Sequence, residues 1–326
     1  MKRKPAAMMG ISTEELNHDK KLWISASSGN FVGELGILAN ELGKKIIAVV
    51  PPRISTQKLE NLLNLGIDVV KVTGEEYDLC PREFTVFLAR AIAHKHDALV
   101  NVDQYNSILN PLSHFLITSQ EIVSEFGKDL THIFVPLGST GTFAGVSEYF
   151  SRFYPNVKIV GVQPTKDHHV PGVHYVVGDC KWSPEIFGLP HKETMRVITI
   201  DDKAAYAALV ELEMKYGIHG GPSTGMVFAA IKQEVRNIRS GNILFFSVDS
   251  AWDYREWNKT ILTDARMGIL DSMDELNLSN YIKILESREK HKARLERIRR
   301  IYNPPSEGRL YTLEDFEKLL DELSML

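Results

Sequence analysis

The sequence predicts an α/β protein made of two lobes, each built on a doubly wound, mostly parallel sheet, with a helical C-terminal extension. Short apolar runs alternate with helical patterns in units of roughly 25 residues, as in parallel sheets that helices cover on both faces. Two of these runs end in small residues that lead straight into a helix. Open α/β sheets bind their ligands at such turns, at the carboxyl ends of the strands.

The first lobe is predicted where strands and helices alternate from Leu22 onward. Val32, Leu35 and Leu38 recur at helical spacing, and Gly43 ends that helix. The polar stretch 103–111 is interpreted as the crossing into the second lobe. In order, we predict a strand from 22, a helix to 42, a strand at 45–50, a helix at 55–65, a strand at 68–72, a helix at 82–95 and a strand at 98–102.

The second lobe repeats the alternation and contains an irregular segment at 165–191. Beyond it, a basic amphipathic pattern at 281–302 and a capping box at Thr312–Asp315 predict two further helices. The basic helix is expected to pack one face on its own domain or on a dimer mate; the alternative is that it binds an acidic partner or a membrane surface. The predicted elements are a helix at 113–126, a strand at 131–137, a helix at 143–153, strands at 158–163 and 194–200, helices at 203–216 and 226–239, and a strand at 242–248.

Composition limits the function classes. The 326 residues are 44% hydrophobic and 25% charged, with a formal net charge of −4, which excludes the chain-wide basic field that nucleic-acid backbones require. No apolar run approaches the roughly 20 residues that span a bilayer, and the N-terminus lacks the apolar core of a signal peptide. We therefore expect a cytoplasmic protein that binds neither nucleic acid nor membrane.

Cysteine and histidine usage predicts no metal site. Cys80 and Cys180 lie far apart without a partner motif, as expected of plain thiols in a reducing compartment. His168, His169 and His174 are possible metal ligands in the irregular segment, but no pair has the i, i+4 spacing of a helical site. A surface loop is the simpler interpretation.

The turn Ser27-Ser28-Gly29-Asn30 is predicted to bind a small anion such as a carboxylate. It joins a strand to a helix, so free backbone N–H groups and the positive end of the helix dipole meet there. The alternative is that Ser28 or Asn30 only caps the helix.

A second turn, Gly138-Ser139-Thr140-Gly141-Thr142, has three hydroxyls and two glycines before a helix, which suits a dianionic phosphate. It has neither the lysine of a Walker loop nor the glycine spacing of a dinucleotide fingerprint. A third small-residue turn, 220–225, precedes the helix at 226–239. Asp249-Ser250 follow the last predicted strand, 242–248, and therefore lie at its carboxyl end.

In this order, these segments resemble the fold type II pyridoxal-phosphate enzymes, closest to the cysteine synthase and cystathionine β-synthase branch. The resemblance runs from about Lys2 to Tyr254. It implies a small substrate-binding lobe at 10–112, a large cofactor-binding lobe at 1–9 and 113–256, and a helical extension at 257–326. It also implies a homodimer.

The resemblance implies a role for each matching residue. Substrate binding is implied for Ser27, Ser28, Gly29, Gln104 and Ser223, with Gln104 on the substrate carboxylate. Cofactor binding is implied for Asn30 at the ring oxygen, for the phosphate loop Gly138, Ser139, Thr140, Gly141 and Thr142, and for Ser250 at the pyridine nitrogen. The implied cofactor is pyridoxal 5'-phosphate.

The implied reaction is a β-replacement on serine, O-acetylserine or O-phosphoserine through an aminoacrylate intermediate. A neutral hydroxyl such as that of Ser250 cannot hold the pyridine nitrogen protonated, so the ring is a weaker electron sink and β-elimination is favoured over transamination. Sulfide or an amine would then give cysteine or a diaminopropionate-type product. Two alternatives stay open: a serine or threonine dehydratase-type lyase, and a non-catalytic relative that binds the cofactor or a partner protein.

The aligned Schiff-base lysine is Lys2. Arg3 and Lys4 replace the aspartate and arginine that follow it in the family, and roughly forty family residues that precede the lysine have no counterpart ahead of Met1. Ser25 stands where relatives often have glutamate. If the chain begins at Met1, we expect weak or absent catalysis. If upstream residues exist, we expect Lys2 to be buried and bound to the cofactor.

Overall fold

The structure is a computed structural model that describes residues 22–27, 29–52, 54–72, 81–176, 196–238, 240–264, 267–269, 275–287 and 307–324. The described residues fall into two compact units. Unit 1 lies within Met1–Leu109 and Lys292–Leu326, and unit 2 lies within Asn110–His291.

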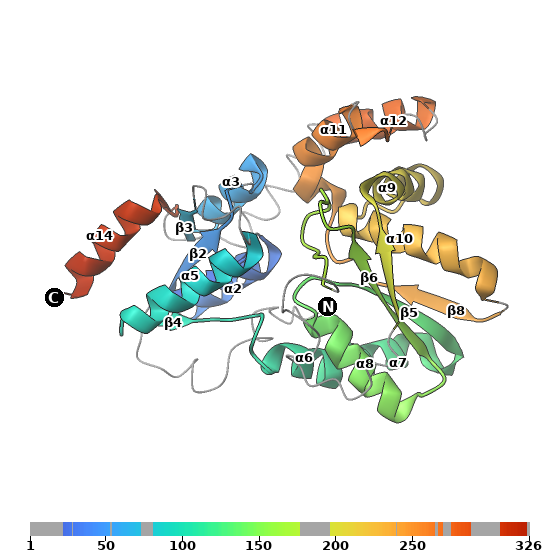
Figure 1. The fold of residues 1–326 in the computed structure, drawn as a ribbon, viewed down its shortest axis with the longest axis horizontal. Coiled ribbons are helices and arrows are strands. Elements are labelled where there is room, and N and C mark those ends of the chain that lie inside the picture. The colour runs from blue at the N-terminus through green and yellow to red at the C-terminus, as the bar shows by residue number, and fades with distance from the viewer. Residues whose placement is uncertain are drawn as a thin grey trace. The chain divides into compact units, whose positions relative to one another are not determined.

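Unit 1 contains a five-stranded sheet in the order β4-β1-β2-β3-β9, in which every pair of neighbouring strands is parallel (Figure 1). The strands are β1 (Leu22–Ala26), β2 (Lys45–Val50), β3 (Asp68–Lys71), β4 (Leu99–Asn101) and β9 (Leu310–Tyr311), and the helices are α2 (Asn30–Glu41), α3 (Thr56–Asn64), α5 (Pro81–Lys95) and α14 (Leu313–Ser324). The elements predicted from 22 to 102 are thus confirmed, with ends shifted by one or two residues.

The central strands β1 and β2 of unit 1 are buried along almost their whole length because helices cover both faces of the sheet. Trp23, Ile46 and Ala48 pack with residues of α2 in one buried cluster. Alternate residues such as Ile24 and Ile47 are equally buried, and α5 packs along β1 and β4. Strands buried on both faces give continuous apolar runs, which is the pattern that the sequence shows.

The edge of the unit 1 sheet is completed by the C-terminal part of the chain. The Val69 N–H donates to the Arg309 carbonyl at 2.8 Å, and the Gly308 N–H donates to the Leu63 carbonyl at 2.8 Å. Thr312 begins α14 as predicted, because its Oγ1 accepts the Asp315 N–H at 3.1 Å. The sequence predicted only helices over 257–326, since a strand of two residues is too short to show alternation.

Unit 2 contains a four-stranded parallel sheet in the order β7-β6-β5-β8. The strands are β5 (Leu130–Pro136), β6 (Lys158–Pro164), β7 (Arg196–Ile200) and β8 (Asn242–Phe245). The helices are α6 (Leu109–Ser113), the π-helix η2 (His114–Thr118), α7 (Ser119–Phe126), η3 (Gly127–Asp129), α8 (Gly141–Phe153), α9 (Asp202–Tyr216), α10 (Pro222–Glu234), η6 (Val235–Asn237), η7 (Ala251–Tyr254), α11 (Arg255–Thr263) and α12 (Glu275–Glu286). The predicted fold class is confirmed.

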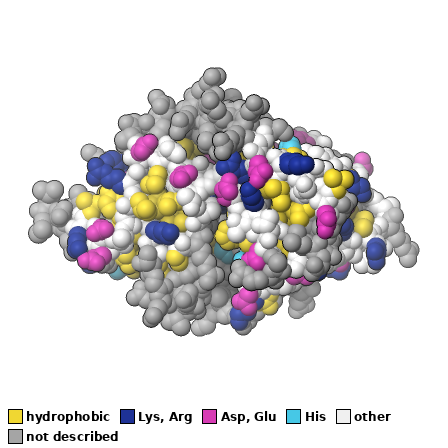
Figure 2. Space-filling view, turned by 90° about the horizontal axis from the view of Figure 1, so that it is seen from above, with side chains coloured by type: hydrophobic (Ala, Val, Ile, Leu, Met, Phe, Trp, Pro, Cys, Tyr) yellow, Lys and Arg dark blue, Asp and Glu magenta, His cyan; other side chains and the backbone are white. Residues whose placement is uncertain are grey.

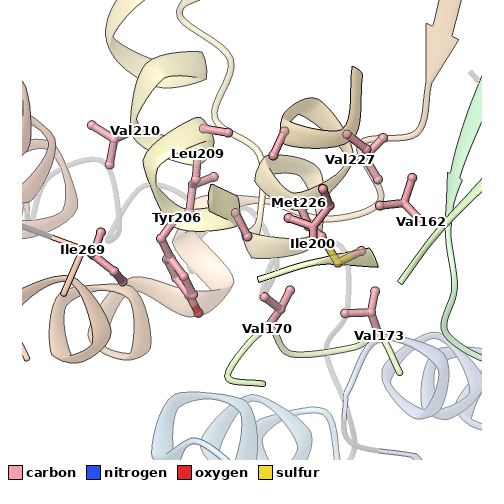
Figure 3. Packing of buried hydrophobic residues seen from close by; sticks show 14 of the residues in the cluster. Val162, Val170, Val173, Ile200, Tyr206, Leu209, Val210, Met226, Val227 and Ile269 are labelled. Atoms are coloured by element: carbon pink, nitrogen blue, oxygen red, sulfur yellow. The ribbon is translucent and has the colours of Figure 1, made fainter. Parts of the chain in front are cut away.

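The strand β5 shows why unit 2 is covered on both faces. Ile133 and Val135 belong to the buried cluster that contains Phe143 of α8, whereas Phe134 between them belongs to the cluster of α9 and α10. Successive side chains of a strand point to opposite faces. Figure 3 shows the second cluster, in which Tyr206 and Leu209 of α9 lie near Met226 of α10.

The described helices after residue 255 pack on unit 2. Ile261 and Leu262 of α11 and Tyr281 and Leu285 of α12 are buried in the cluster of α9 and α10. The predicted basic helix begins inside α12, and its residues from 288 to 302 lie outside the described part of the chain.

The predicted boundaries of two elements in unit 2 are wrong: the strand predicted at 242–248 ends at Phe245, and the helix predicted at 226–239 differs at both ends. The helix α10 begins at Pro222, not at Met226, with Gly221 at the N-cap. Proline at the first helical position has a φ angle suited to a helix, and the N–H that it lacks has no intrahelical partner there. Ser223 and Thr224 therefore lie in the first turn of the helix rather than in a loop.

The surface has mixed charge on the face that Figure 2 shows, where Lys and Arg side chains are interspersed with Asp and Glu. No continuous basic stripe of the kind that follows a nucleic-acid backbone is seen among the described residues of this face. None of the helices in the described ranges is long and apolar enough to cross a membrane.

The attachment of the C-terminal segment can be tested at Phe316, which is 1% exposed and packs on Tyr311 with ring centroids 6.0 Å apart. We expect Phe316→Ala to cost about 3–5 kcal/mol of local packing and to speed amide exchange at Val69, whose partner is on the C-terminal segment. Phe87→Ala, at a 68% exposed position of α5, is the matched control. Unchanged exchange at Val69 in the Phe316 variant would contradict this account.

Candidate functional site

The turn between β1 and α2 leaves the start of the helix without a side-chain cap. The helix begins at Asn30, and its N-cap is Gly29, which has no side chain to cap it. The buried Ser27 accepts the Gly29 N–H on its Oγ at 3.4 Å. Asn30 is the first helical residue, so it is not the N-cap that the capping alternative required. Ser28 lies outside the described residues.

A buried cation lies against this turn. Lys58 of α3 is only 9% exposed, and a Cβ added to Gly29 would lie 2.9 Å from its Nζ. The ammonium therefore adds positive charge at the positive end of the α2 dipole, which strengthens the attraction for an anion. Sequence reasoning missed Lys58, because a lysine within an amphipathic helix gives no signal of burial.

Gln104 is held at the same turn. Its Nε2 donates to the Ala26 carbonyl at 3.4 Å, next to Ser27. The loop that carries it is fixed by Asp103, whose Oδ1 accepts the Tyr105 N–H at 2.9 Å and whose Oδ2 accepts the Arg90 Nε–H at 2.6 Å. Unit 1 thus brings Ser27, Gly29, Asn30 and Gln104 together at the carboxyl end of β1.

The turn after β5 in unit 2 is strained. Thr140 has φ 67°, the left-handed region, and no other non-glycine residue in the described ranges has a positive φ. It is the N-cap of α8, but its side chain caps no backbone N–H. A left-handed residue followed by helical ones turns successive N–H groups toward one point, where they can bind an anion. Strain of this kind is typical of ligand sites.

Two glycines let α8 approach the segment 110–115 closely. A Cβ on Gly141 would overlap the Asn110 side chain, and a Cβ on Gly145 would lie 2.7 Å from the Cβ of His114. Because of this contact, the Asn110 Nδ2 donates to the Ser139 Oγ at 3.1 Å. Asn110 is therefore a site residue that sequence reasoning left unassigned.

His114 contacts the last residue of the same turn. Its Nε2 lies 3.1 Å from the Thr142 Oγ1, and its Nδ1 lies 3.0 Å from the Thr118 Oγ1. Burial lowers the pKa of His114 to about 4, so the imidazole is neutral at pH 7. The sequence signal for this residue, a histidine and a threonine four apart on one helix, is too common to identify it.

Ser250 lies beyond the end of β8 and begins η7. Its Oγ accepts the Trp252 N–H at 3.4 Å, and its own N–H donates to Asp253 Oδ2 at 3.4 Å. Gly220 and Ser250 form an antiparallel bridge, which places the start of α10 beside Ser250. Ser223, in that first turn, is 2% exposed, and its Oγ has no hydrogen-bond partner among the described residues.

The sheet of unit 2 places its site residues at one edge. β5 and β8 are parallel neighbours, with Phe134 opposite Phe245. The turn 138–142 and Ser250 follow these two strands, so both lie at the carboxyl edge of the sheet. Lys2 lies outside the described residues.

The histidines of the segment from 165 to 176 have local roles. His168 accepts the Val170 N–H on its Nδ1 at 3.2 Å, and the His169 Nδ1 lies 2.9 Å from Asp202 Oδ2. Within the described ranges, no three His, Cys, Asp or Glu side chains form a group that could hold a metal ion. Cys180 lies outside those ranges.

Comparison with known proteins identifies the family. The family described as pyridoxal-phosphate dependent enzyme matches residues 2–249. The chain belongs to this family. A cysteine synthase from Helicobacter pylori is 30% identical over 223 residues, 67% of this chain and 71% of the relative. The resemblance to the fold type II enzymes of the cysteine synthase and cystathionine β-synthase branch is thus confirmed.

Two further relatives belong to the same branch. An N-(2-amino-2-carboxyethyl)-L-glutamate synthase from Cupriavidus metallidurans is 28% identical over 219 residues, 64% of this chain and 62% of the relative. The crystal structure of an O-acetylserine dependent cystathionine beta-synthase from Helicobacter pylori matches with a TM-score of 0.64 at 25% identity, covering 73% of this chain and 78% of that one. The cofactor of the family is pyridoxal 5'-phosphate.

The residues of unit 2 fit this cofactor. Thr140 and the N-terminus of α8 offer backbone N–H groups to a phosphate dianion. Gly138 and Gly141 let neighbouring segments approach this turn closely: a Cβ on Gly138 would lie 2.7 Å from the Gly172 carbonyl oxygen, and one on Gly141 would overlap the Asn110 side chain. Ser139, Thr142 and Ser250 add hydroxyl groups that can donate to phosphate oxygens or to a ring nitrogen.

The depressed pKa of His114 makes a testable prediction about stability. Its folded pKa of about 4 lies below the ordinary value of 6.5, so between these values the unfolded chain binds a proton that the folded chain does not. Stability should therefore fall as the pH is lowered from 6.5 to about 4, by roughly 3 kcal/mol from this group. Urea unfolding at several pH values should show a shallower fall for His114→Gln. If the free energy of unfolding fell equally with pH in the variant and in the original chain, the lowered pKa of His114 would be refuted.

Proposed function

We propose that the chain catalyses a β-replacement on serine, O-acetylserine or O-phosphoserine, in which sulfide or an amine takes the place of the β-substituent. The product is cysteine or a diaminopropionate-type amino acid. The names of the relatives support this class of reaction, since one is a cysteine synthase, one joins an amino-carboxyethyl group to glutamate, and one depends on O-acetylserine. An enzyme of this kind serves amino-acid biosynthesis.

The observation that carries the proposal is the hydrogen bonding of Ser250. Because its Oγ accepts the Trp252 N–H, its single proton is free to be donated to an unprotonated ring nitrogen. When bound, pyridoxal phosphate withdraws electrons from the substrate Cα, and an unprotonated ring does so more weakly, which favours loss of a β-substituent over transamination. A carboxylate in this position would favour the opposite outcome.

Unit 2 is proposed to hold the phosphate. Gly138, Ser139, Thr140, Gly141 and Thr142 surround it with N–H and O–H donors. Helix-terminus charge terms are worth about 0.3–1 kcal/mol when exposed and up to ~2 kcal/mol when partly buried, so the binding depends on several donors together. Asn30 is proposed to meet the ring oxygen, as in the family.

Unit 1 is proposed to bind the substrate carboxylate. Ser27, Ser28, Gly29 and Gln104 supply hydrogen-bond donors, and Lys58 supplies charge near Gly29. Two loops of one unit that converge on one anion also support a closure of this unit when substrate binds. Ser223 is enclosed in the first turn of α10, so its proposed contact with substrate requires that turn to open.

Lys2 is the proposed lysine for covalent attachment of the cofactor, and the proposed assembly is a homodimer. Borohydride reduction followed by peptide mapping tests the lysine: a phosphopyridoxyl group on Lys2 supports it, and one on another lysine overturns the alignment. Size-exclusion chromatography with light scattering tests the assembly.

The central experiment is product analysis of the purified chain after addition of pyridoxal phosphate. With O-acetylserine or O-phosphoserine, we expect a new amino acid only when sulfide or an amine is added, together with release of acetate or phosphate. Pyruvate formed at the same rate with and without the nucleophile would indicate the dehydratase instead. Loss of visible cofactor absorbance after desalting would refute the pyridoxal-phosphate assignment for this chain.

The carboxylate site makes a separate prediction. Gln104→Leu and Lys58→Met should each weaken serine binding roughly ten- to a hundredfold, since a hydrogen bond to a charged group is worth about 1.5–3 kcal/mol. Neither should change the affinity for ethanolamine, which is serine without its carboxylate. Lys95→Met, an exposed lysine at the end of α5, is the control for the loss of one charge. If the affinities for serine and ethanolamine fell equally, the site would not recognise the carboxylate.

A further inference from the structure

We propose that His114 is a positioning residue that directs the Thr142 hydroxyl proton toward the cofactor phosphate. This inference rests on the proposed phosphate role of Thr142. His114 lies on the π-helix η2 with its Nε2 3.1 Å from the Thr142 Oγ1, and it acts through Thr142.

The close packing of α8 fixes the distance between the two side chains. The space left by Gly145 is filled by Pro111, the Cβ of His114 and the Phe115 amide. Three residues before Gly145, Thr142 lies on the neighbouring part of the same helix face. The π-helix places the Thr118 Oγ1 3.0 Å from the His114 Nδ1, so the His114 ring bridges Thr118 of η2 and Thr142 of α8. Single-turn π-helices occur frequently at functional sites.

The hydrogen-bond pattern around the His114 ring determines whether Thr142 donates its hydroxyl proton to the phosphate or to the ring. A neutral imidazole has one N–H donor and one acceptor nitrogen. If Nε2 carries the proton, it donates to the Thr142 Oγ1, and the Thr142 proton is free for a phosphate oxygen. If Nδ1 carries it, Thr142 must donate to Nε2, and only its lone pairs face the phosphate. A dianion therefore selects the first arrangement, with Thr118 donating to Nδ1.

The resulting chain of donors runs in one direction, from Thr118 through His114 and Thr142 to the phosphate, and such chains strengthen each bond by polarisation. The imidazole stays uncharged at neutral pH, so it contributes direction rather than charge. Asn110, four residues before His114, has a similar effect on Ser139. The Ser139 Oγ accepts the Asn110 Nδ2–H, which leaves the Ser139 proton free to donate.

The test compares affinities for pyridoxal 5'-phosphate and for pyridoxal, which lacks the phosphate, by titration of the apoprotein. His114→Leu should weaken the binding of the phosphorylated form about tenfold and leave the binding of pyridoxal unchanged. His114→Gln, whose side-chain amide can donate from the Nε2 position, should restore most of the affinity. Thr142→Val combined with His114→Leu should be no weaker than Thr142→Val alone.

His132→Leu is the matched control, because His132 also lies beside a threonine, with its Nδ1 2.9 Å from the Thr131 Oγ1, but at the opposite end of β5. It should leave both affinities unchanged. Equal weakening of both ligands by His114→Leu, or additive losses in the double variant, would show a merely structural role and overturn the inference. If the original chain binds neither ligand, the proposed function itself fails, which is a different result.

Discussion

The contact between α8 and the segment 110–118 depends on the absence of a side chain at Gly141 and Gly145. Any Cβ there would meet Asn110, Pro111 or His114. The contact brings two nitrogen-bearing side chains to the hydroxyls of the turn 138–142. The strained φ of Thr140 then turns the backbone at the start of α8. Two glycines on one helix face therefore allow the contacts of Asn110 and His114 with the hydroxyl groups of the turn.

A common rule connects the hydroxyls at the carboxyl edge of the unit 2 sheet. Ser139 accepts from Asn110 and Ser250 accepts from Trp252, and each then has one proton left to give. A hydroxyl that already accepts an N–H bond has its free proton available for a ligand. A sheet edge that offers several hydroxyl donors suits a ligand with many hydrogen-bond acceptors and few donors. A phosphorylated pyridine is such a ligand.

Sequence reasoning found most of the fold because strands buried on two faces leave continuous apolar runs, as Lys45–Val50 and Leu130–Pro136 do. It also found the turns, since glycine and hydroxyl residues between a strand and a helix mark the start of the helix. It missed Lys58 and His114, whose roles depend on contacts between elements rather than on spacing along the chain. It also placed the start of α10 four residues late, because the small residues after Pro222 were taken for a loop when proline had already begun the helix.

The strand β9 has a consequence for how the chain folds during synthesis. Unit 2 is continuous in sequence, so it can fold as soon as its residues emerge from the ribosome. Unit 1 cannot finish its sheet until the segment around Arg309 has been made, because the Arg309 N–H donates to the Asp68 side chain, 241 residues earlier. Until then the edge of β3 stays unpaired, and unpaired strand edges are sites of association between nascent chains. The strand β9 thus protects the edge of a sheet whose other four strands are made much earlier.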